Sequence, residues 1–270
     1  MLISGQLREG STFEHGRNRV SHLLMAGREA DTLLDYGCGN AEFALAVREE
    51  LGLRVLACDI DADLVARLRA EHGEQVEFFT VSDTEPKLEL ADGSISLITC
   101  CDVLEHMPAA LRLASLKEMH RVLSDDGALI VTTPHKGIFA WLDPENAKYY
   151  FPRLHRLVFT AIKGREKYRQ RFGGERFGNF SAGAMRHLHF SASELSEMLE
   201  PAGFQVQEVR YFTLIYPFIK TLLWFAESLV GRVPGARRLT AWCWKVYIWD
   251  ADLEPGRLAG SIGLRAVRRR

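Results

Sequence analysis

Short apolar runs alternate with segments of helical periodicity throughout the first half of this 270-residue chain. Alternation of this kind is typical of βαβ units, in which helices cover both faces of a parallel sheet. We expect five buried strands there, at Asp31–Tyr36, Arg54–Cys58, Val76–Val81, Ser94–Cys100 and Ala128–Thr133. The pattern therefore predicts an α/β fold with a doubly wound sheet.

The expected helices separate these strands and continue after them. Ser191 and Glu194 have the spacing of a capping box, which predicts a helix that ends at Ala202 and Gly203. Other helices are predicted at Ala41–Leu51, at Ala62–Glu71 and in an amphipathic segment that starts near Leu111 and is stopped by Asp125-Asp126-Gly127. Two late strands are expected at Phe204–Arg210 and Leu258–Val267.

Two segments, 136–189 and 211–256, interrupt this order. With 47% hydrophobic residues the chain can bury a sizeable core, so we expect a single domain over 1–270 with these segments as insertions. Residues 136–190 hold 11 basic and 4 acidic side chains (net +7), against 12 and 23 in residues 1–135 (net −11). A basic lid could receive a phosphate or carboxylate of a substrate, and a solvated helix face is an equally good interpretation.

The second insertion is rich in aromatic side chains. It holds ten of the 27 aromatic residues of the chain. These side chains either pack into a small hydrophobic core, the alternative we favour, or place residues 211–249 at a membrane surface. Pro217, Lys220 and Glu227 interrupt the apolar stretch from Tyr211 to Val230, so we expect no transmembrane helix there.

The segment Leu33–Ala44, LLDYGCGNAEFA, joins an acidic residue at a strand end to two glycines and a helix start. Gly37 and Gly39 allow backbone N–H groups to approach a ligand, and the N-terminus of the following helix favours a carboxylate or phosphate. Asp59 follows twenty residues after Gly39, where an acid receives the ribose hydroxyls of a nucleoside. We therefore expect a nucleoside site, although a purely structural turn would use the same glycines.

Acidic residues also follow the next two strands. Asp83 comes after the third strand and Asp102 after the fourth, and open α/β sheets bind ligands at the carboxyl ends of their strands. A dinucleotide site is the weaker alternative. The segment Gly37-Cys38-Gly39-Asn40-Ala41-Glu42 supplies only the first two glycines of the G-x-G-x-x-G fingerprint.

In order and spacing, DYGCGNAEFA, ACDID, VSD, CCDVLEHM, LSDDGALIVTTP and HFSASELSEMLEPAGF resemble the class I S-adenosylmethionine-dependent methyltransferases. The resemblance is greatest to the branch of quinone-biosynthesis and small-molecule O-methyltransferases. It implies S-adenosylmethionine as cofactor and a Rossmann-like, seven-stranded sheet whose last strand is antiparallel, with both insertions at the carboxyl edge. Many members carry glycine where this chain has Ala41, and alanine is tolerated at a helix start.

The resemblance also implies roles for the residues of the predicted site. Asp35, Gly37 and Gly39, with Cys38 between them, would border the methionine part of the cofactor. The remaining positions are Asp59 for the ribose hydroxyls, Ile60 and Asp83 for the adenine, and Asp102 for the far wall.

Methyl transfer from a sulfonium needs a base only where the acceptor arrives protonated. His106 and His135 both follow strands at the ligand edge, where a neutral imidazole could take a hydroxyl proton. In the resembling quinone methyltransferases a Glu-His pair after the fourth strand lies near the acceptor, which implies a role for Glu105 and His106. The structural interpretation, a helix entry for His106 and a loop for His135, stays open.

We therefore expect an S-adenosylmethionine-dependent methyltransferase that methylates, on oxygen, a small or lipid-like acceptor able to carry an acidic group. The alternatives are methylation of a sugar or glycan intermediate in polysaccharide assembly and a non-catalytic nucleoside-binding module. The net charge of −1 argues against a nucleic-acid partner, including an RNA substrate. The five cysteines lack CxxC or CxxH spacing, so we expect reduced thiols, no metal site and a cytoplasmic protein. Any membrane contact, through residues 211–249, is expected to be peripheral.

Overall fold

The computed structural model describes residues 1–6, 10–138, 140–143, 146–172, 187–231 and 233–269. The chain divides into two compact units. The sheet unit consists of Met1–Thr133, Phe190–Arg210 and Ile262–Arg270, and the helical unit consists of Pro134–His189 and Tyr211–Ser261. Both segments that the sequence marks as insertions fall within the helical unit, and the role of a lid stays a prediction.

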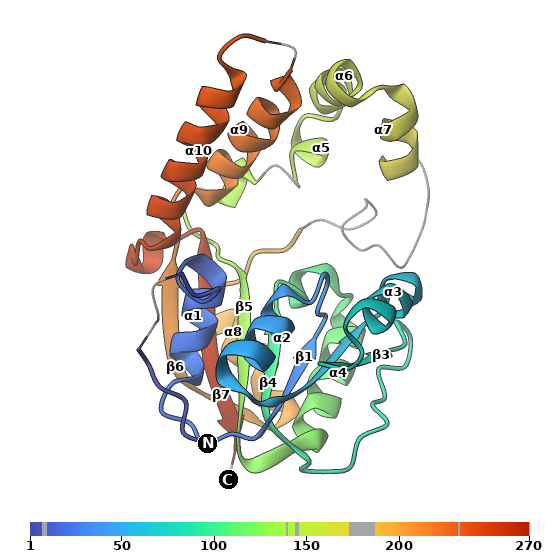
Figure 1. The fold of residues 1–270 in the computed structure, drawn as a ribbon, viewed down its shortest axis with the longest axis vertical. Coiled ribbons are helices and arrows are strands. Elements are labelled where there is room, and N and C mark those ends of the chain that lie inside the picture. The colour runs from blue at the N-terminus through green and yellow to red at the C-terminus, as the bar shows by residue number, and fades with distance from the viewer. Residues whose placement is uncertain (7–9, 139, 144–145, 173–186, 232, 270) are drawn as a thin grey trace. The chain divides into compact units, whose positions relative to one another are not determined.

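The sheet has seven strands in the order β3-β2-β1-β4-β5-β7-β6, and the last strand is antiparallel (Figure 1). β1 pairs in parallel with β2 and β4, β2 pairs with β3, and β4 pairs with β5. The strands are β1 (Thr32–Tyr36), β2 (Arg54–Asp59), β3 (Glu77–Thr80), β4 (Ile95–Cys101), β5 (Leu123–Pro134), β6 (Phe204–Phe212) and β7 (Ser261–Arg268). The predicted Rossmann-like α/β fold is confirmed.

β1 lies inside the sheet, between β2 and β4. All five of its residues are buried, and Leu33 and Leu34 are completely inaccessible. A strand that is buried on both faces requires a nearly continuous apolar run, which explains why β1 does not alternate apolar and polar residues. Asp35 interrupts that run one residue before the strand ends, so its carboxyl group is buried at the carboxyl edge of the sheet.

The helices of the sheet unit have recognisable starts. Asp61 caps α3 by accepting hydrogen bonds from the N–H groups of Asp63 and Leu64, and the predicted capping box of Ser191 and Glu194 forms at the start of α8. The elements are α1 (Gly16–Met25), α2 (Glu42–Ala46, continued by a π-helical turn, η1, over Val47–Leu51), α3 (Ala62–His72), η2 (Leu104–His106), α4 (Ala109–Val122), α8 (Ala192–Leu199) and η5 (Glu200–Ala202).

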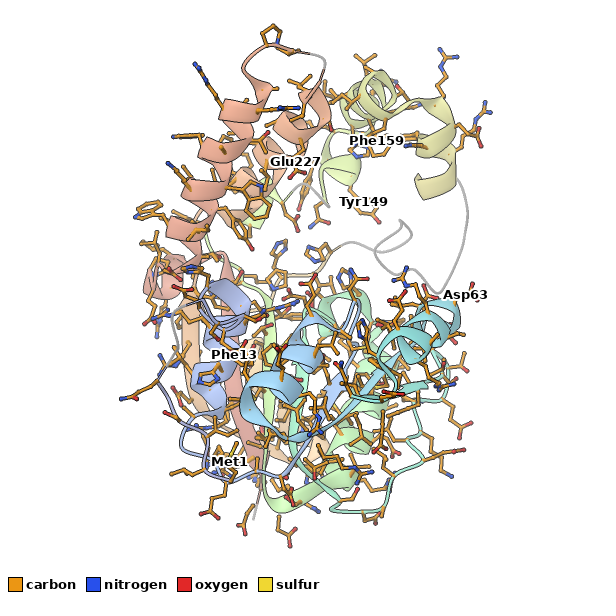
Figure 2. The ribbon with its side chains drawn as sticks, in the orientation of Figure 1. Met1, Phe13, Asp63, Tyr149, Phe159 and Glu227 are labelled. Atoms are coloured by element: carbon orange, nitrogen blue, oxygen red, sulfur yellow. The ribbon has the colours of Figure 1, made fainter. Side chains whose placement is uncertain are left out.

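α1 lies outside every element predicted from the sequence. Its residues Val20 and Leu24 are buried in the sheet unit. Phe13, labelled in Figure 2, packs against the rings of His22 and Phe43, with centroid distances of 4.9 and 5.5 Å. The segment before the first predicted strand is therefore part of the hydrophobic core.

The boundary between α4 and β5 differs from the prediction. β5 follows α4 at once, at Leu123, which pairs with Ile95 of β4. The next pair joins Ala128 to Leu97, so the residues between Leu123 and Ala128 bulge out of the ladder. The sequence Asp125-Asp126-Gly127 breaks regular structure as expected, but it interrupts a strand instead of ending a helix.

The helical unit contains the elements that the loose sequence pattern left undefined. α9 and α10 pack on each other around Leu223, Ala226 and Cys243. Its elements are η3 (Ala140–Leu142), α5 (Ala147–Tyr150), α6 (Pro152–Lys163), α7 (Arg165–Phe172), α9 (Tyr216–Leu229), α10 (Ala236–Ala251) and η6 (Gly256–Leu258). Because η6 occupies the predicted start of the last strand, β7 begins at Ser261 instead of Leu258. In the described part of the chain no helix combines the length and the apolar character that a bilayer crossing requires.

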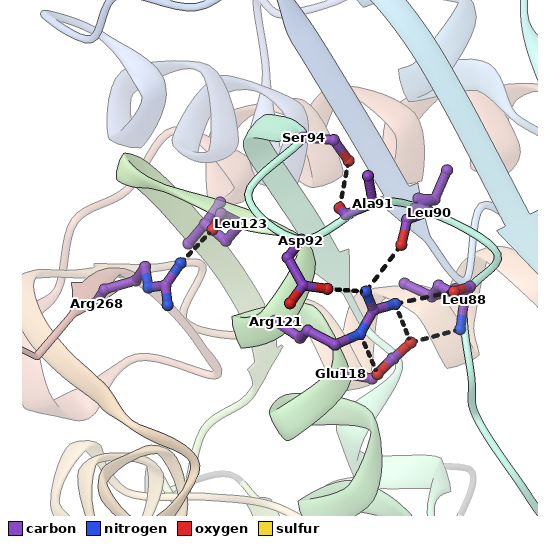
Figure 3. Close-up of polar contacts among 9 residues, drawn as sticks. All are labelled: Leu88, Leu90, Ala91, Asp92, Ser94, Glu118, Arg121, Leu123 and Arg268. Carbon is purple, nitrogen blue, oxygen red and sulfur yellow. Dashed lines mark hydrogen bonds and ion pairs between the residues drawn. The ribbon is translucent and has the colours of Figure 1, made fainter.

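Arg121, in the last turn of α4, holds the loop that connects β3 to β4 (Figure 3). Its guanidinium donates to the carbonyl groups of Leu88 and Leu90, at 2.9 and 2.8 Å, and pairs with Glu118 and Asp92. Glu118 also accepts a hydrogen bond from the N–H group of Leu88 at 2.7 Å. One side chain therefore satisfies acceptors from two parts of the loop.

Replacing Arg121 with alanine should lower the free energy of unfolding by about 2 to 3 kcal/mol, because two loop carbonyls and two carboxylates lose their shared donor. Urea unfolding measures this change. Arg54→Ala is the matched control: its pair with Glu77 is exposed on both sides, so its loss should cost less than about 1 kcal/mol. Equal costs for the two variants would contradict the structural role of Arg121.

Candidate functional site

A cavity of about 270 Å³ lies at the carboxyl end of β1. Five of the residues predicted to bind the cofactor line it, namely Asp35, Gly37, Cys38, Gly39 and Asp102. The other lining residues are Arg17, Asn40, Glu42, Phe43 and Cys101. The cavity therefore brings together residues from α1, the turn after β1, the start of α2 and the end of β4.

The glycine turn after β1 is held against the end of β2. The N–H groups of Gly37 and Cys38 both donate to the carbonyl of Cys58, at 2.8 and 2.9 Å. Gly37 has φ +80°, and a Cβ atom there would lie 2.4 Å from Cγ2 of Val103. Packing therefore requires glycine at this position, whatever ligand the cavity takes.

Asp59 connects the end of β2 to the same turn, although it lies outside the cavity lining. Its Oδ2 accepts a hydrogen bond from the N–H group of Gly39 at 3.0 Å, and its Oδ1 accepts one from the N–H group of Asp61 at 3.1 Å. Both carboxylate oxygens are thus oriented by the backbone. The two other predicted residues outside the lining differ in exposure, since Ile60 is half-buried and Asp83 is exposed on the loop after β3.

Asp35 is a buried acid, with 4% of its surface exposed. Its Oδ1 accepts a hydrogen bond from the hydroxyl of Thr99 on β4, at 2.8 Å. Burial raises the pKa of Asp35 to about 6, and the hydrogen bond from Thr99 opposes this rise. A cation in the cavity would favour the ionised form of the side chain.

Asp102 follows β4 in the left-handed region, with φ +55°. Its N–H group donates to the carbonyl of Thr132 at 2.9 Å, and its Oδ2 pairs with Nη1 of Arg17 at 3.1 Å. Backbone conformations of this kind are uncommon for residues with a Cβ and gather at functional sites. Arg17 is the main residue of the cavity that sequence reasoning missed, because an isolated arginine before the first predicted strand belongs to no motif.

Ala41 also adopts a left-handed conformation, with φ +61° and ψ +16°. Its side chain is completely buried, and its carbonyl accepts a hydrogen bond from the N–H group of Leu45 at 2.9 Å. The chain therefore accommodates alanine where many members of the resembling class have glycine. This conformation costs about 1 to 2 kcal/mol for a residue with a Cβ. The sequence predicted an ordinary helix start at Ala41, without a left-handed backbone.

Glu105 and His106 lie together on η2, after β4. Glu105 is completely buried, and its Oε2 accepts a hydrogen bond from the hydroxyl of Thr133 at 3.1 Å. Burial, followed by the charge of Asp102, raises the pKa of Glu105 well above the usual carboxyl range. Burial thus favours the neutral form of Glu105, and the partly exposed His106 follows it in the chain.

His135, the third predicted catalytic residue, belongs to the helical unit. It is 5% exposed, its Nδ1 donates to the carbonyl of Ala259 at 2.9 Å, and its ring packs edge-on against that of Tyr211. The hydrogen bond at Nδ1 leaves Nε2 as the proton acceptor of the neutral ring. The structure thus brings Glu105 and His106 together and places His135 in the other unit.

Residues 12–209 match a protein-family model described as a methyltransferase domain. The match covers most of the chain. The chain belongs to this methyltransferase family. The resemblance to class I S-adenosylmethionine-dependent methyltransferases is confirmed, and S-adenosylmethionine is the cofactor of the family.

A curated relative of this methyltransferase is the ubiquinone biosynthesis O-methyltransferase of Pseudomonas paraeruginosa, which is 30% identical over 135 residues. The match covers 47% of the chain and 56% of the relative. The chain thus spans about half the length of the curated relatives that it matches.

Solved structures share the fold at lower identity. The cyclase SpnF is 19% identical with a TM-score of 0.52, and the match covers 93% of the methyltransferase and 80% of SpnF. The 1,6-didemethyltoxoflavin-N1-methyltransferase of Burkholderia thailandensis, solved with 1,6-didemethyltoxoflavin and S-adenosylhomocysteine, is 18% identical with a TM-score of 0.51, over 93% and 77% of the two chains. A cyclase and a methyltransferase on one fold show that the fold does not decide the reaction.

The stability of the methyltransferase should depend on pH through Asp35. Its pKa is about 6 in the folded protein, against about 3.9 for an exposed aspartate. The protonated carboxyl group of Asp35 therefore makes its full contribution to the stability of the fold below about pH 4. This contribution is lost as the pH rises through about 6. Asp35→Asn removes the ionisation, so its stability relative to the wild type should increase by about 2 kcal/mol between about pH 4.5 and pH 8.

Urea unfolding of the ligand-free protein at the two pH values measures this difference. Asp83→Asn, at an exposed carboxylate, is the control for the general effect of removing a negative charge. A stability difference between Asp35→Asn and the wild type that does not change with pH would contradict the buried, titrating state of Asp35.

Proposed function

We propose that this methyltransferase transfers the methyl group of S-adenosylmethionine to an oxygen atom of a small or lipid-like acceptor. The observation that carries the proposal is the cavity at the carboxyl end of β1, where a glycine turn meets the carboxyl groups of Asp35 and Asp102 in a chain of the methyltransferase family. The name of the curated relative, a ubiquinone biosynthesis O-methyltransferase, supports oxygen as the acceptor atom and a lipid-like acceptor.

In this proposal Asp59 receives the ribose hydroxyls of the cofactor. Both of its oxygens are already oriented by backbone N–H groups, so little side-chain freedom is lost on binding. The adenine lies beside Ile60 and Asp83, which follow β2 and β3 in the sequence. The nucleoside half of the cofactor is thereby assigned to the ends of two neighbouring strands.

The methionine half of the cofactor is assigned to the cavity itself, along the turn of Gly37, Cys38 and Gly39. Asp35 and Asp102 supply negative charge for the ammonium and sulfonium groups, with Asp102 as the far wall. Arg17 ends in the same cavity and can bind a carboxylate through its planar, multidentate guanidinium. These groups together complement the charges of both ends of the methionine part.

The reaction is an in-line displacement at the methyl carbon. The S–CH₃ bond breaks with its electron pair on sulfur, which yields neutral S-adenosylhomocysteine, while the acceptor oxygen forms the new O–CH₃ bond and gives up its proton. Holding donor and acceptor collinear supplies much of the catalysis. We assign the proton to His106 or His135, because burial favours the neutral form of Glu105 and so makes it a poor base.

The surface of α6 supports a lipid-like acceptor. Leu154, Leu157 and Val158 lie at i, i+3 and i+4 and are 58%, 66% and 39% exposed. Phe159, labelled in Figure 2, is buried and packs beside His155. The buried side of α6 is therefore formed by residues other than those of the exposed stripe. An amphipathic helix that turns an apolar stripe to solvent is typical of a membrane-surface contact.

Basic and aromatic residues accompany this stripe. Residues 152–169 contain six basic residues and one acidic residue, a net charge of +5, and the basic side chains are exposed. On α10, Trp242, Trp244 and Trp249 are 51%, 45% and 58% exposed, which supports the membrane alternative for the aromatic insertion over core packing. We infer that the helical unit contacts an anionic bilayer surface, where a lipid-like acceptor resides.

Incubation with methyl-labelled S-adenosylmethionine and a cell lysate should place label in the organic extract. Asp59→Ala should incorporate about tenfold less label, because the loss of charged hydrogen bonds weakens cofactor binding by about 1 to 3 kcal/mol. Equilibrium binding of S-adenosylhomocysteine measures that loss directly. Asp63→Ala, at an exposed position on α3, is the control and should behave as the wild type.

The distribution of the label separates the alternatives. Label in a glycan or aqueous fraction would contradict a lipid-like acceptor and favour a sugar intermediate. Label in no fraction, with binding of S-adenosylhomocysteine intact, would contradict the enzyme and favour a nucleoside-binding module.

Membrane contact is tested separately, by flotation with liposomes of anionic lipid. The wild type should float at low salt and less at high salt, because salt screens the attraction of the basic residues. Leu157→Glu should abolish most of the flotation, whereas Leu258→Glu, at a leucine 51% exposed outside α6, should leave it unchanged. An absence of flotation at both salt concentrations would contradict the contact.

A further inference from the structure

We propose that the helical unit contains a site for one divalent transition-metal ion, formed by Asp143, His187 and His189. These three side chains bring one ligand atom each to within 4.8 Å of one another. All three belong to the helical unit, and the cavity of the sheet unit does not include them. None of the three residues has a role in the proposed methyl transfer.

The local sequence explains how the three side chains meet. His187 and His189 are two positions apart in the chain, and their imidazole rings contact each other edge-on. Their ring centroids are 5.7 Å apart. Asp143 follows the η3 turn, with its N–H group bonded to the carbonyl of Ala140 at 3.3 Å. Segments 44 residues apart in the chain thus supply the two kinds of ligand.

The spacing of the three groups is close to that of a metal site. Oδ2 of Asp143 lies 2.5 Å from Nδ1 of His187 and 3.2 Å from Nε2 of His189. Ligand atoms that surround one ion at about 2.0 to 2.2 Å are themselves separated by up to roughly 4 Å. To enclose an ion, the cluster releases the proton of the hydrogen bond between Asp143 and His187, and these two ligand atoms separate by roughly 1 Å.

Burial and charge also favour a cation. The side chains of Asp143, His187 and His189 are only 6%, 15% and 11% exposed. The carboxylate of Asp143 is withdrawn from water, and an ion in such surroundings is stabilised by an opposite charge. A divalent cation bound by all three groups would supply that charge.

Asn146 fixes the position of one ligand without contacting the proposed ion. Its Nδ2 donates to the carbonyl of His187 at 2.7 Å, and its Oδ1 accepts a hydrogen bond from the N–H group of the same residue at 3.1 Å. Asn146 is itself 3% exposed, so these bonds are shielded from water. Supporting contacts of this kind orient the ligands of metal sites.

The chemistry of the donors selects the class of ion. Two imidazole nitrogens and one carboxylate oxygen suit Zn²⁺, Fe²⁺ or Co²⁺, whereas Mg²⁺ and Ca²⁺ prefer oxygen ligands alone. Three protein ligands also leave a coordination position for water or another small ligand. We therefore assign the site to a borderline first-row ion and not to an alkaline-earth ion.

The test is titration of the chelator-treated, full-length protein with Co²⁺, whose visible absorption reports ligation. The wild type should bind one equivalent, Zn²⁺ should displace it, and Mg²⁺ should not. Asp143→Asn and His189→Ala should each weaken Co²⁺ binding at least tenfold, and Asn146→Ala should weaken it by about 10- to 100-fold. Circular dichroism of each variant checks that the chain remains folded.

His72→Ala is the matched control. His72 also lies near a carboxylate, that of Glu71 at 3.9 Å, but on the partly exposed surface of α3. Its loss should leave Co²⁺ binding unchanged. The proposal is overturned if the wild type binds no Co²⁺ or Zn²⁺, or if the folded Asp143 and His189 variants bind as tightly as the wild type, because the cluster is then only a hydrogen-bonded contact. Binding of S-adenosylhomocysteine, measured in the same samples, reports separately on the cavity of the sheet unit.

Discussion

The burial of β1 is the constraint on which the candidate site depends. β2 and β4 pair with its two edges and all five of its residues are buried, so the turn that follows β1 lies at the carboxyl edge of the sheet. There the turn packs so closely against Val103 that position 37 admits only glycine. The same turn binds the end of β2 through Cys58 and Asp59. A packing requirement of the core thus creates the backbone that faces the cavity.

The distribution of charge distinguishes the proposed cofactor site from the proposed membrane surface. In the cavity, burial raises the pKa of Asp35. Asp102 adopts an uncommon backbone conformation beside Arg17. A cofactor with a sulfonium, an ammonium and a carboxylate would meet opposite charges at each of these groups. Residues 152–169 of α6 and α7 instead carry a net charge of +5, on the surface that we propose for an anionic membrane. Acidic and basic regions of one nearly neutral chain are thereby assigned to different ligands.

Most strands and helices of the sheet unit could be predicted because each has a local signal. Apolar runs mark the buried strands, and the capping box of Ser191 and Glu194 marks the start of α8. The errors occur where a signal permits two structures. Asp125-Asp126-Gly127 breaks regular structure in a strand as readily as after a helix, and Ala41 carries no mark of its left-handed backbone. α1 was missed because its burial depends on partners that are distant in the sequence: Ser21 contacts Cys101, and the carbonyl of Leu24 accepts a hydrogen bond from Arg265.

The sequence by itself determined the α/β class, the methyltransferase family and five residues of the cavity lining, because strand ends and glycine turns are local features that recur in order. Only the tertiary structure brought Arg17 to Asp102, gave Asp35 and Glu105 their raised pKa values, and assembled Asp143 with His187 and His189. These properties arise from contacts between residues that are far apart in the chain and from the exclusion of water around them. Neither the partners nor the burial is encoded within a single segment, so both are decided by how the folded segments pack.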